Sequence, residues 1–127
     1  MSTSHNVFVD GPWTPETLVA EITSLRPDLE VLPLGDGSRR FVGDDLAGDV
    51  GPHSYEADGE LRFDTYPLLV DIWGPTHGAV GEAGRPADEV RDAFARRLVE
   101  RLRALGQSRL LYAFDFKTRL DHFDPEP

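Results

Sequence analysis

The chain has 127 residues, of which 39% are hydrophobic and 28% are charged, and its formal net charge is −10. This length and composition predict one globular domain with a single hydrophobic core. The absence of cysteine excludes disulfides and thiolate chemistry. The negative charge argues against binding to nucleic-acid phosphates or to an anionic membrane, and it favours a basic protein partner. Because no signal-peptide pattern or long apolar run is present, we expect a cytoplasmic protein.

The first third of the chain predicts a strand, a helix and a hairpin. Residues 6–9 are a short apolar strand, and Thr14 followed by proline is typical of the start of a helix. Apolar side chains at helical spacing continue this helix through Leu25. Residues 29–34 and 39–42 are apolar runs joined by a glycine-rich turn, which predicts a hairpin. A proline within its first strand indicates that this strand lies at a sheet edge.

An acidic stretch follows, with seven acidic side chains and one arginine between residues 44 and 64. We expect turns and edge strand here, with strands at 53–57 and 60–64 joined by a tight Asp-Gly turn. Acid-rich loops often serve solubility alone. Aromatic side chains interleaved with the acids are also typical of protein interfaces, and this is the basis for a predicted partner-binding set. Its members are Asp44, Asp45, Asp49, Tyr55, Glu56, Asp58, Glu60, Asp64, Tyr66 and Trp73.

The second half predicts a central strand, a loop, a helix and a last strand. Residues 68–73 are apolar on both faces, as in a strand at the middle of a sheet. Residues 74–86 are rich in glycine and predict a loop, whereas 86–105 carry an apolar helical stripe that ends at Gly106. We expect the arginines of this helix to pair with its own acidic residues. Residues 110–116 then predict the final strand.

This order of elements predicts an α+β fold, with a mostly antiparallel sheet and two helices on one face. It is close to a ferredoxin-like βαββαβ pattern that carries the acidic stretch as an insertion. Residues 1–120 are predicted to form the single domain. Residues 121–127 are predicted to be an acidic, flexible C-terminal tail.

Motifs for catalysis, metals and cofactors are scarce. The four histidines are far apart, so no element carries metal ligands at short spacing, and His53 and His77 are expected to be solvated loop residues. The glycine-rich segments do not fit phosphate-binding loops, so we predict no metal and no cofactor. Asp71 and Asp115 lie within predicted strands; if these strands are neighbours, the carboxylates could converge as an acid and a base. The simpler alternative is that each is solvated or paired with an arginine.

The second half also resembles a known class of proteins. The run from Leu61 to Trp73, the helix from Phe94 to Gly106 and the strand from Leu110 to Phe116 are similar to small bacterial immunity proteins of polymorphic toxin and contact-dependent inhibition systems. The shared features are a strand with an aromatic-proline pair, an amphipathic helix ending in Leu-x-x-Leu-Gly, and a last strand with an aspartate between aromatics. The resemblance implies a cytoplasmic α+β inhibitor that blocks one toxin by binding and has no catalytic residues. An acidic inhibitor would suit a basic toxin, such as a nuclease domain.

Three hypotheses follow from the sequence. The leading one is a non-catalytic immunity- or antitoxin-type inhibitor that binds a basic toxin domain through the acidic, aromatic-bearing stretch. The first alternative is a small enzyme that uses the Asp71 and Asp115 carboxylates. The second is a structural module that forms a homodimer through the open edge at residues 29–34.

Overall fold

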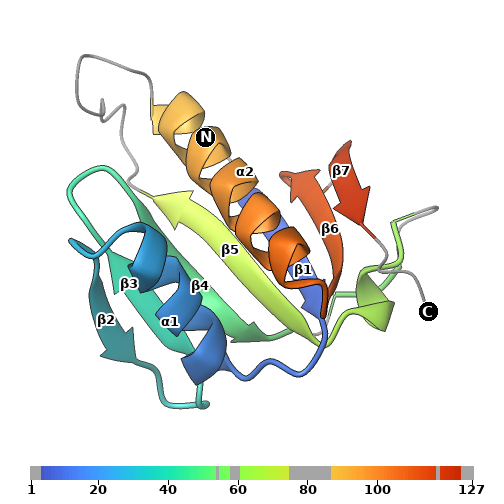
Figure 1. Ribbon diagram of the computed structural model, residues 1–127, viewed down its shortest axis with the longest axis horizontal. Helices are drawn as coiled ribbons and strands as arrows, with labels where there is room; N and C mark the ends of the chain where they lie inside the picture. Colours follow the sequence, from blue (N-terminus) through green and yellow to red (C-terminus); the bar gives the residue numbers. More distant parts are fainter. Residues whose placement is uncertain (1–3, 54, 58–60, 75–86, 117, 124–127) are drawn as a thin grey trace.

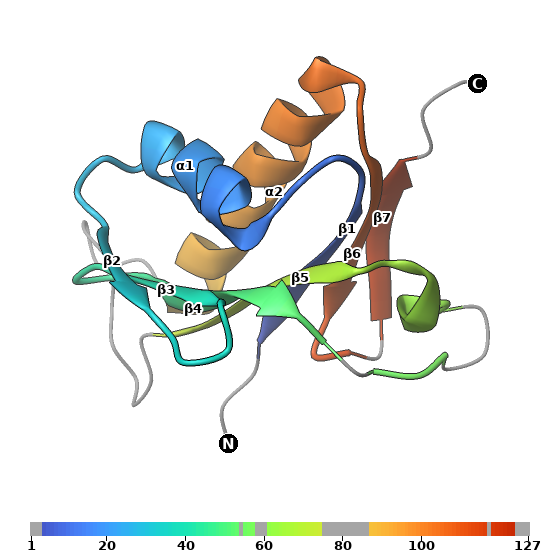
Figure 2. The ribbon, with the colours of Figure 1, turned by 90° about the horizontal axis from the view of Figure 1, so that it is seen from below.

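Seven antiparallel strands form one sheet within the part of the chain that the structure describes, and two helices lie against it (Figures 1 and 2). This computed structural model describes residues 4–53, 55–57, 61–74, 87–116 and 118–123. The sheet order is β2-β3-β4-β5-β1-β6-β7, and every neighbouring pair is antiparallel. The strands are β1 (His5–Asp10), β2 (Glu30–Pro33), β3 (Arg39–Val42), β4 (Ala47–Pro52), β5 (Leu68–Gly74), β6 (Arg109–Phe114) and β7 (Thr118–Phe123).

The two predicted helices are confirmed, with their expected ends. In α1 (Pro15–Leu25) the Thr14 hydroxyl accepts a hydrogen bond from the Thr17 N–H at 3.2 Å, and the Thr17 hydroxyl accepts one from the Thr14 N–H at 2.9 Å. This reciprocal cap satisfies two backbone donors that the helix leaves unpaired. The second helix, α2 (Ala87–Leu105), is followed by Gly106 at φ +70, the left-handed conformation that favours glycine after a helix.

The main core lies between the sheet and the two helices, which share one side of it (Figure 2). Side chains alternate between the faces of a strand, so Val7 and Val9 of β1 enter this core while Phe8 points to the other face. From α1 and α2, Ile22 and Leu98 are fully buried against the same layer. Burying a side chain of this size contributes about 1.5–3 kcal/mol each to the driving force for folding.

The opposite side of the sheet, the helix-free face, is half apolar and half polar. A second cluster around Phe8 covers the part formed by β1, β5 and β6, and its cover comes from residues 61–66 with the short helix η1 (Phe63–Thr65). The remaining part, over β3, β4 and β5, carries the polar side chains Arg40, Asp49 and Asp71. The helix-free face therefore has a small core at one end and an exposed polar surface at the other.

The prediction of an α+β fold with a mostly antiparallel sheet is correct, but the ferredoxin-like order is wrong. Two strands were not predicted: β4, inside the acidic stretch, and β7, which includes residues 121–123 of the predicted tail. Glycine and proline are depleted in strands, and β4 reads Ala-Gly-Asp-Val-Gly-Pro, so its pattern indicated a loop. Residues 124–127 of the predicted tail lie outside the described residues.

Other predictions for the connecting segments have mixed outcomes. The hairpin of β2 with β3 is confirmed, and β2 is the exposed edge strand. The predicted strand at 60–64 is wrong, since η1 begins at Phe63. The predicted loop at 74–86 falls almost wholly outside the described residues, as does His77. In the described residues, neither helix is both long enough and apolar enough to cross a membrane.

Candidate functional site

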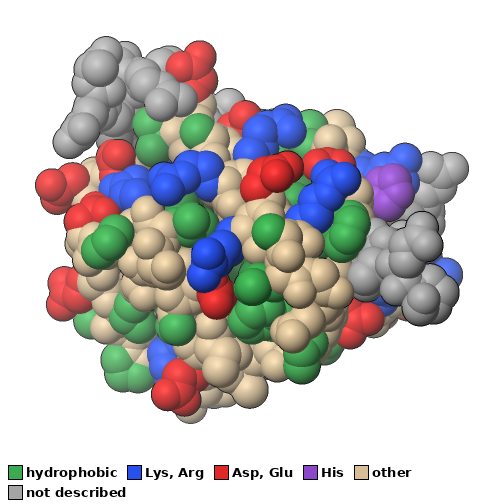
Figure 3. All heavy atoms as spheres, in the orientation of Figure 1, with side chains coloured by type: hydrophobic (Ala, Val, Ile, Leu, Met, Phe, Trp, Pro, Cys, Tyr) green, Lys and Arg blue, Asp and Glu red, His purple; other side chains and the backbone are tan. Residues whose placement is uncertain are grey.

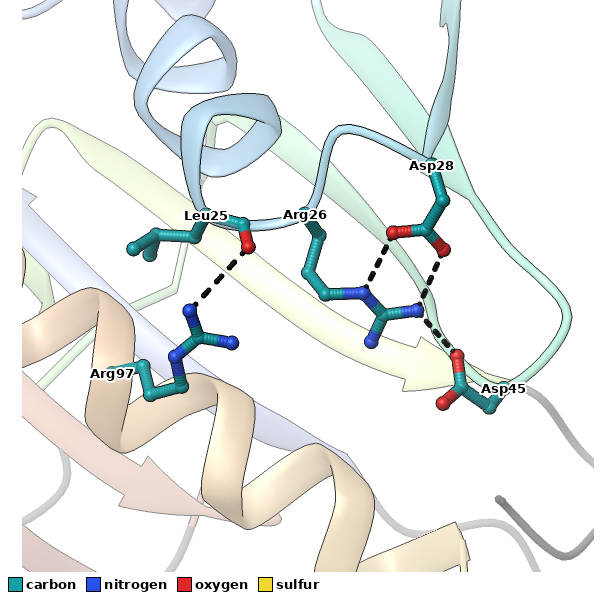
Figure 4. Close-up of polar contacts among 5 residues, drawn as sticks. All are labelled: Leu25, Arg26, Asp28, Asp45 and Arg97. Atoms are coloured by element: carbon teal, nitrogen blue, oxygen red, sulfur yellow. Dashed lines mark hydrogen bonds and ion pairs between the residues drawn. The ribbon is translucent and has the colours of Figure 1, made fainter.

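Several of the predicted partner-binding residues pair with arginines of this chain. Asp45, between β3 and β4, lies 2.7 Å from Nη2 of Arg26, which also contacts Asp28 at 2.8 Å (Figure 4). These hydrogen bonds raise the pKa of Arg26, and the one to Asp28 has the larger effect. In turn, the hydrogen bond from Arg26 lowers the pKa of Asp28. In the same view Arg97 of α2 donates to the carbonyl oxygen of Leu25 at 3.4 Å. Asp45 thus ties a loop to the end of α1.

Asp49 and Trp73 belong to a second internal network. Arg40 of β3 donates to both oxygens of Asp49, at 2.7 and 3.3 Å. The indole N–H of Trp73 donates to the same carboxylate at 3.0 Å, and the Arg40 guanidinium lies 5.2 Å from the centre of the Trp73 ring. The carboxylate, the ring and the cation of this network come from three adjacent strands. Its charges are therefore already compensated within the chain.

Tyr66 is a core residue rather than an exposed anchor, which corrects the sequence prediction. Only 8% of it is exposed, and it packs in the second cluster with Phe8. Arg109 lies over its ring at 4.3 Å and donates to the Thr65 carbonyl at 2.6 Å. The proline after Tyr66 and the aromatic residues before it were compatible with either role, and burial decides between them.

The remaining predicted acids are exposed or outside the described residues. Asp64 is exposed in η1 and pairs with Arg62 at 3.2 Å. Asp44 and Glu56 are exposed. Asp58 and Glu60 lie outside the described residues. The described acids of this stretch are thus distributed over the loop before β4, β4 itself, the chain that follows it and η1.

A cleft on the helix-free face brings together residues that the sequence did not group. It has a volume of about 430 Å³ and lies over β4 and β5, between the β2–β3 turn and the chain that follows β4. Of the predicted binding residues that the structure describes, only Asp49 and Tyr55 line it. The described residues in its lining are Leu34, Asp36, Ser38, Asp49, Val50, Gly51, Pro52, His53, Tyr55, Leu69 and Asp71. The charged residues among these are acidic, and we call it the acidic cleft.

Asp71 is the most perturbed carboxyl group in the acidic cleft. It is half-buried, and burial raises its pKa to about 6, assisted by the negative charges of Asp49 and Asp115. Neutral donors hold it: the Asn6 amide donates to Asp71 Oδ1 at 3.0 Å, and the Ser4 hydroxyl also bonds to it. Among the described residues no Lys, Arg or His lies within ion-pair distance of Asp71. Its ionised form therefore lacks a compensating cation in the described structure.

Asp71 and Asp115 interact, though not from neighbouring strands as the enzyme hypothesis assumed. Strand β1 lies between β5 and β6 in the sheet. Asp115 lies in the turn after β6, where Asp115 and Phe116 have φ of 52° and 58°. The Asp115 N–H donates to the Ser4 carbonyl at 2.7 Å, and the Phe116 N–H donates to Asn6 Oδ1 at 2.8 Å. Asn6, which is fully buried, thus connects this strained turn to Asp71.

His53 and Tyr55 form the aromatic end of the acidic cleft. The His53 ring nitrogens contact the Tyr66 carbonyl at 2.6 Å and the Tyr55 N–H at 3.1 Å, so Nε2 carries the proton and Nδ1 accepts. His53 is therefore a neutral, oriented side chain, not the solvated imidazole that was predicted. Tyr55 is 44% exposed, and its ring stacks on Phe116 with centroids 4.4 Å apart. Burial and the charge of Asp71 raise the Tyr55 pKa, which places the phenol near that carboxylate.

Sequence reasoning missed three contributors to the acidic cleft. Asp36 lies in the β2–β3 turn, where its carboxylate accepts a hydrogen bond from the Ser38 N–H at 3.0 Å. Ser38 packs so closely on Gly51 that a Cβ at Gly51 would lie 2.0 Å from the serine oxygen. The sequence signals that could have indicated these residues were the Asp-Gly-Ser turn at 36–38 and the glycine at position 51. Both patterns are also explained by turn and strand geometry alone.

The described residues contain no group of three or more His, Asp or Glu side chains that could hold a metal ion. The fold and the site together define an α+β protein, built on one antiparallel sheet, with an acidic cleft on the face that the helices leave uncovered. Comparisons of the chain with protein-family models, with curated proteins and with solved structures find no match.

Proposed function

We propose that this protein is a non-catalytic binding protein that captures a basic protein partner through the acidic cleft and its surroundings. The observation that supports this most directly is Asp71, a half-buried carboxylate with a raised pKa and no cation beside it among the described residues. A cation placed there by a partner would relieve this unfavourable charge, so the free energy that burial costs the free protein would be recovered in the complex.

The finer proposal is an inhibitor of the immunity or antitoxin type, acting in the cytoplasm on a basic toxin domain such as a nuclease. It is supported by the resemblance of the second half of the chain to small immunity proteins and by the net charge of −10. Charge of this size attracts a basic partner over distances longer than a contact. The exposed acids Asp44, Glu56 and Asp64 would contribute to this attraction while the acidic cleft makes the contact.

The test is a matched pair of double variants, measured with a tagged protein and the basic protein that it retains from its host. Asp36→Asn with Asp71→Asn removes two negative charges from the acidic cleft and keeps both hydrogen-bond acceptors. Glu16→Gln with Glu100→Gln removes two exposed charges from the helices instead. Both variants have the same net charge. We expect the cleft variant to lose at least tenfold in affinity and the helix variant to lose much less.

Equal losses for the two double variants would mean that net charge alone causes retention, and would overturn the assignment of the acidic cleft as the contact site. No change in either variant would overturn the electrostatic basis of the proposal as a whole.

An acid–base enzyme is the second candidate, and the raised pKa of Asp71 is the observation that favours it. A carboxyl group that titrates near 6 can hold or release a proton at neutral pH, and Asp115 acts on it electrostatically. The neutral Asn6 and Ser4 side chains bond to this group, and His53 lines the same cleft. This candidate predicts that Asp71→Asn abolishes a chemical activity while partner binding, if any, is unchanged, the reverse of the binding proposal.

A further inference from the structure

The acidic cleft has one carboxylate whose charge is not yet compensated within the described residues. Asp49 already accepts from Arg40 and Trp73, and Asp36 accepts from the backbone of its own turn. Among the described residues, Asp71 accepts from neutral groups, Asn6 of β1 and Ser4 just before it, and the neighbouring charged groups Asp49 and Asp115 are negative. A ligand that enters the cleft therefore meets a site for one positive charge.

The adjacent network shows the arrangement that such a charge adopts on this surface. Arg40 donates through two nitrogens to Asp49, and its guanidinium lies over the Trp73 ring. Asp71 is the direct cross-strand partner of Asp49 in the pairing of β4 with β5. Tyr55 is the aromatic ring near it, since the charge of Asp71 affects the phenol. The cleft thus also places a carboxylate, Asp71 of β5, near an aromatic ring, that of Tyr55 in the chain after β4, but without a cation among the described residues.

We propose that the acidic cleft is a pocket for a single arginine side chain of the partner, whose guanidinium pairs with Asp71 beside the Tyr55 ring. This inference rests on the proposed function and specifies its contact. Arginine suits the site better than lysine because a guanidinium is planar, binds carboxylates through two nitrogens, stacks on aromatic rings and sheds water more easily at a half-buried site. The cleft volume of about 430 Å³ is within the range of pockets that take one small group.

The experiment uses acetyl-arginine-amide as the probe and the isotope-labelled full chain as the receptor. Nα-acetyl-citrulline amide has nearly the same shape without the charge. Nα-acetyl-lysine amide has the charge without the planar guanidinium group. Two readouts are taken by NMR: the backbone amides that move on titration, and the pH midpoint of the Asp71 carboxyl carbon. The Asp71→Asn variant and the Glu100→Gln variant serve as the disabled site and the matched control.

We expect the arginine probe at saturation to move the amides of residues that line the acidic cleft and to lower the Asp71 midpoint by about one pH unit. The lysine probe should bind several-fold more weakly, and citrulline should leave the midpoint unchanged. Asp71→Asn should abolish the amide shifts, whereas Glu100→Gln should retain them. Equal shifts with citrulline, or an Asp71 midpoint that arginine does not move, would overturn the inference.

This outcome is separable from that of the proposed function. If the Asp36 and Asp71 double variant loses the basic partner but the arginine probe leaves Asp71 unaffected, the arginine pocket is wrong and the binding role stands. If the probe binds at Asp71 but no partner distinguishes the cleft variant from the helix variant, the pocket stands and the proposed function fails.

Discussion

At the scale of single residues, the buried charge of Asp71 lowers the stability of the folded chain at neutral pH. Its pKa is raised from 3.8 to about 6 because folding removes water from the carboxylate. Well below pH 3.8 the group is protonated in both the folded and the unfolded chain and has no effect on stability. As the pH rises from 3.8 towards 6, the unfolded chain ionises while the folded chain keeps its proton, so the folded state loses stability, and the loss is complete above the folded pKa of about 6. After allowance for its partial exposure, this cost is about 1–2 kcal/mol.

Asp71→Asn is therefore expected to stabilise the protein at pH 7.5 by about 1–2 kcal/mol, because the neutral amide removes the buried charge and keeps the Asn6 hydrogen bond. At about pH 3, below both pKa values, the variant and the natural chain should be equally stable. Urea unfolding at the two pH values measures this difference. A variant that is less stable than the natural chain at pH 7.5 would mean that Asp71 has a cation partner in the folded protein.

The two tyrosines of the predicted binding set should differ sharply in their effect on folding. Tyr66 is 8% exposed within the second cluster, so Tyr66→Ala should lower the free energy of unfolding by about 3–5 kcal/mol. Tyr55 is 44% exposed, and Tyr55→Ala should cost about 1 kcal/mol or less through the lost stacking on Phe116. Thermal unfolding of both variants tests the assignment of Tyr66 to the core and Tyr55 to the surface; similar losses would contradict it.

At the scale of elements, the sequence predicts well where local patterns and caps agree. The Thr14 cap, the stripe of α2 with Gly106, and the apolar run of β5 each combine a period with a boundary signal. Strand β4 has neither: its glycines allow Phe41 and Ser38 to pack on the backbone, where a Cβ at Gly48 would lie 2.4 Å from the Phe41 ring. This strand is specified by its neighbours β3 and β5, a tertiary cause that local propensity does not report.

The turn between β6 and β7 is the element that links the fold to the acidic cleft. Two consecutive non-glycine residues, Asp115 and Phe116, adopt a left-handed conformation there, which costs about 1–3 kcal/mol each. Hydrogen bonds from their N–H groups to Ser4 and Asn6 hold this conformation. The turn places Phe116 against Tyr55 and the Asp115 charge near Asp71. Sequence analysis placed Asp115 inside a strand, because an aspartate between aromatics fits the period of a strand.

Asp115→Asn tests the coupling of this turn to the acidic cleft. Asparagine tolerates the left-handed conformation, so the turn should persist, while the loss of one negative charge should lower the pKa of Asp71. Carbon NMR titration of Asp71 measures the change. Asp64→Asn in η1 removes a charge that does not contribute to the Asp71 shift and should leave this titration unchanged. An Asp71 midpoint that stays the same in both variants would remove Asp115 from the site.

The candidate site was harder to predict than the elements that carry it. Composition indicated an acidic binding surface and the acidic stretch supplied Asp49 and Tyr55, but Asp36 and Asp71 come from other parts of the chain. Sequence alone does not reveal which acids an arginine already neutralises, and this distinguishes Asp45 from Asp71. The relevant information is the strand order, which brings β4 and β5 together and separates β5 from β6.

At the scale of the whole molecule, charge is distributed unequally between the two faces. The helix-covered face shows acidic and basic side chains side by side (Figure 3). Two ion pairs involve these helices: Asp92 with Arg96 at 3.1 Å and Glu21 with Arg101 at 2.8 Å. The first confirms the predicted pairing within α2 for Arg96, whereas Arg101 pairs with α1 instead. On the other face, the charged residues that the structure describes in the lining of the acidic cleft are acidic. Under the proposed function, a basic partner would be attracted by the net charge and oriented by the acidic cleft.

The association rate with a basic partner should consequently depend on salt more strongly than the dissociation rate does. Raising the ionic strength from about 0.05 M to about 0.5 M shortens the screening length to about 4 Å, which removes the long-range attraction and leaves the contact at Asp71 largely intact. We expect the association rate constant to fall about tenfold or more, as measured by surface plasmon resonance. The cleft variant should dissociate faster than the natural chain at both salt concentrations, because it lacks the contact itself, whereas the helix variant should differ mainly in association. An association rate that salt leaves unchanged would mean that the net charge of −10 has no part in recognition.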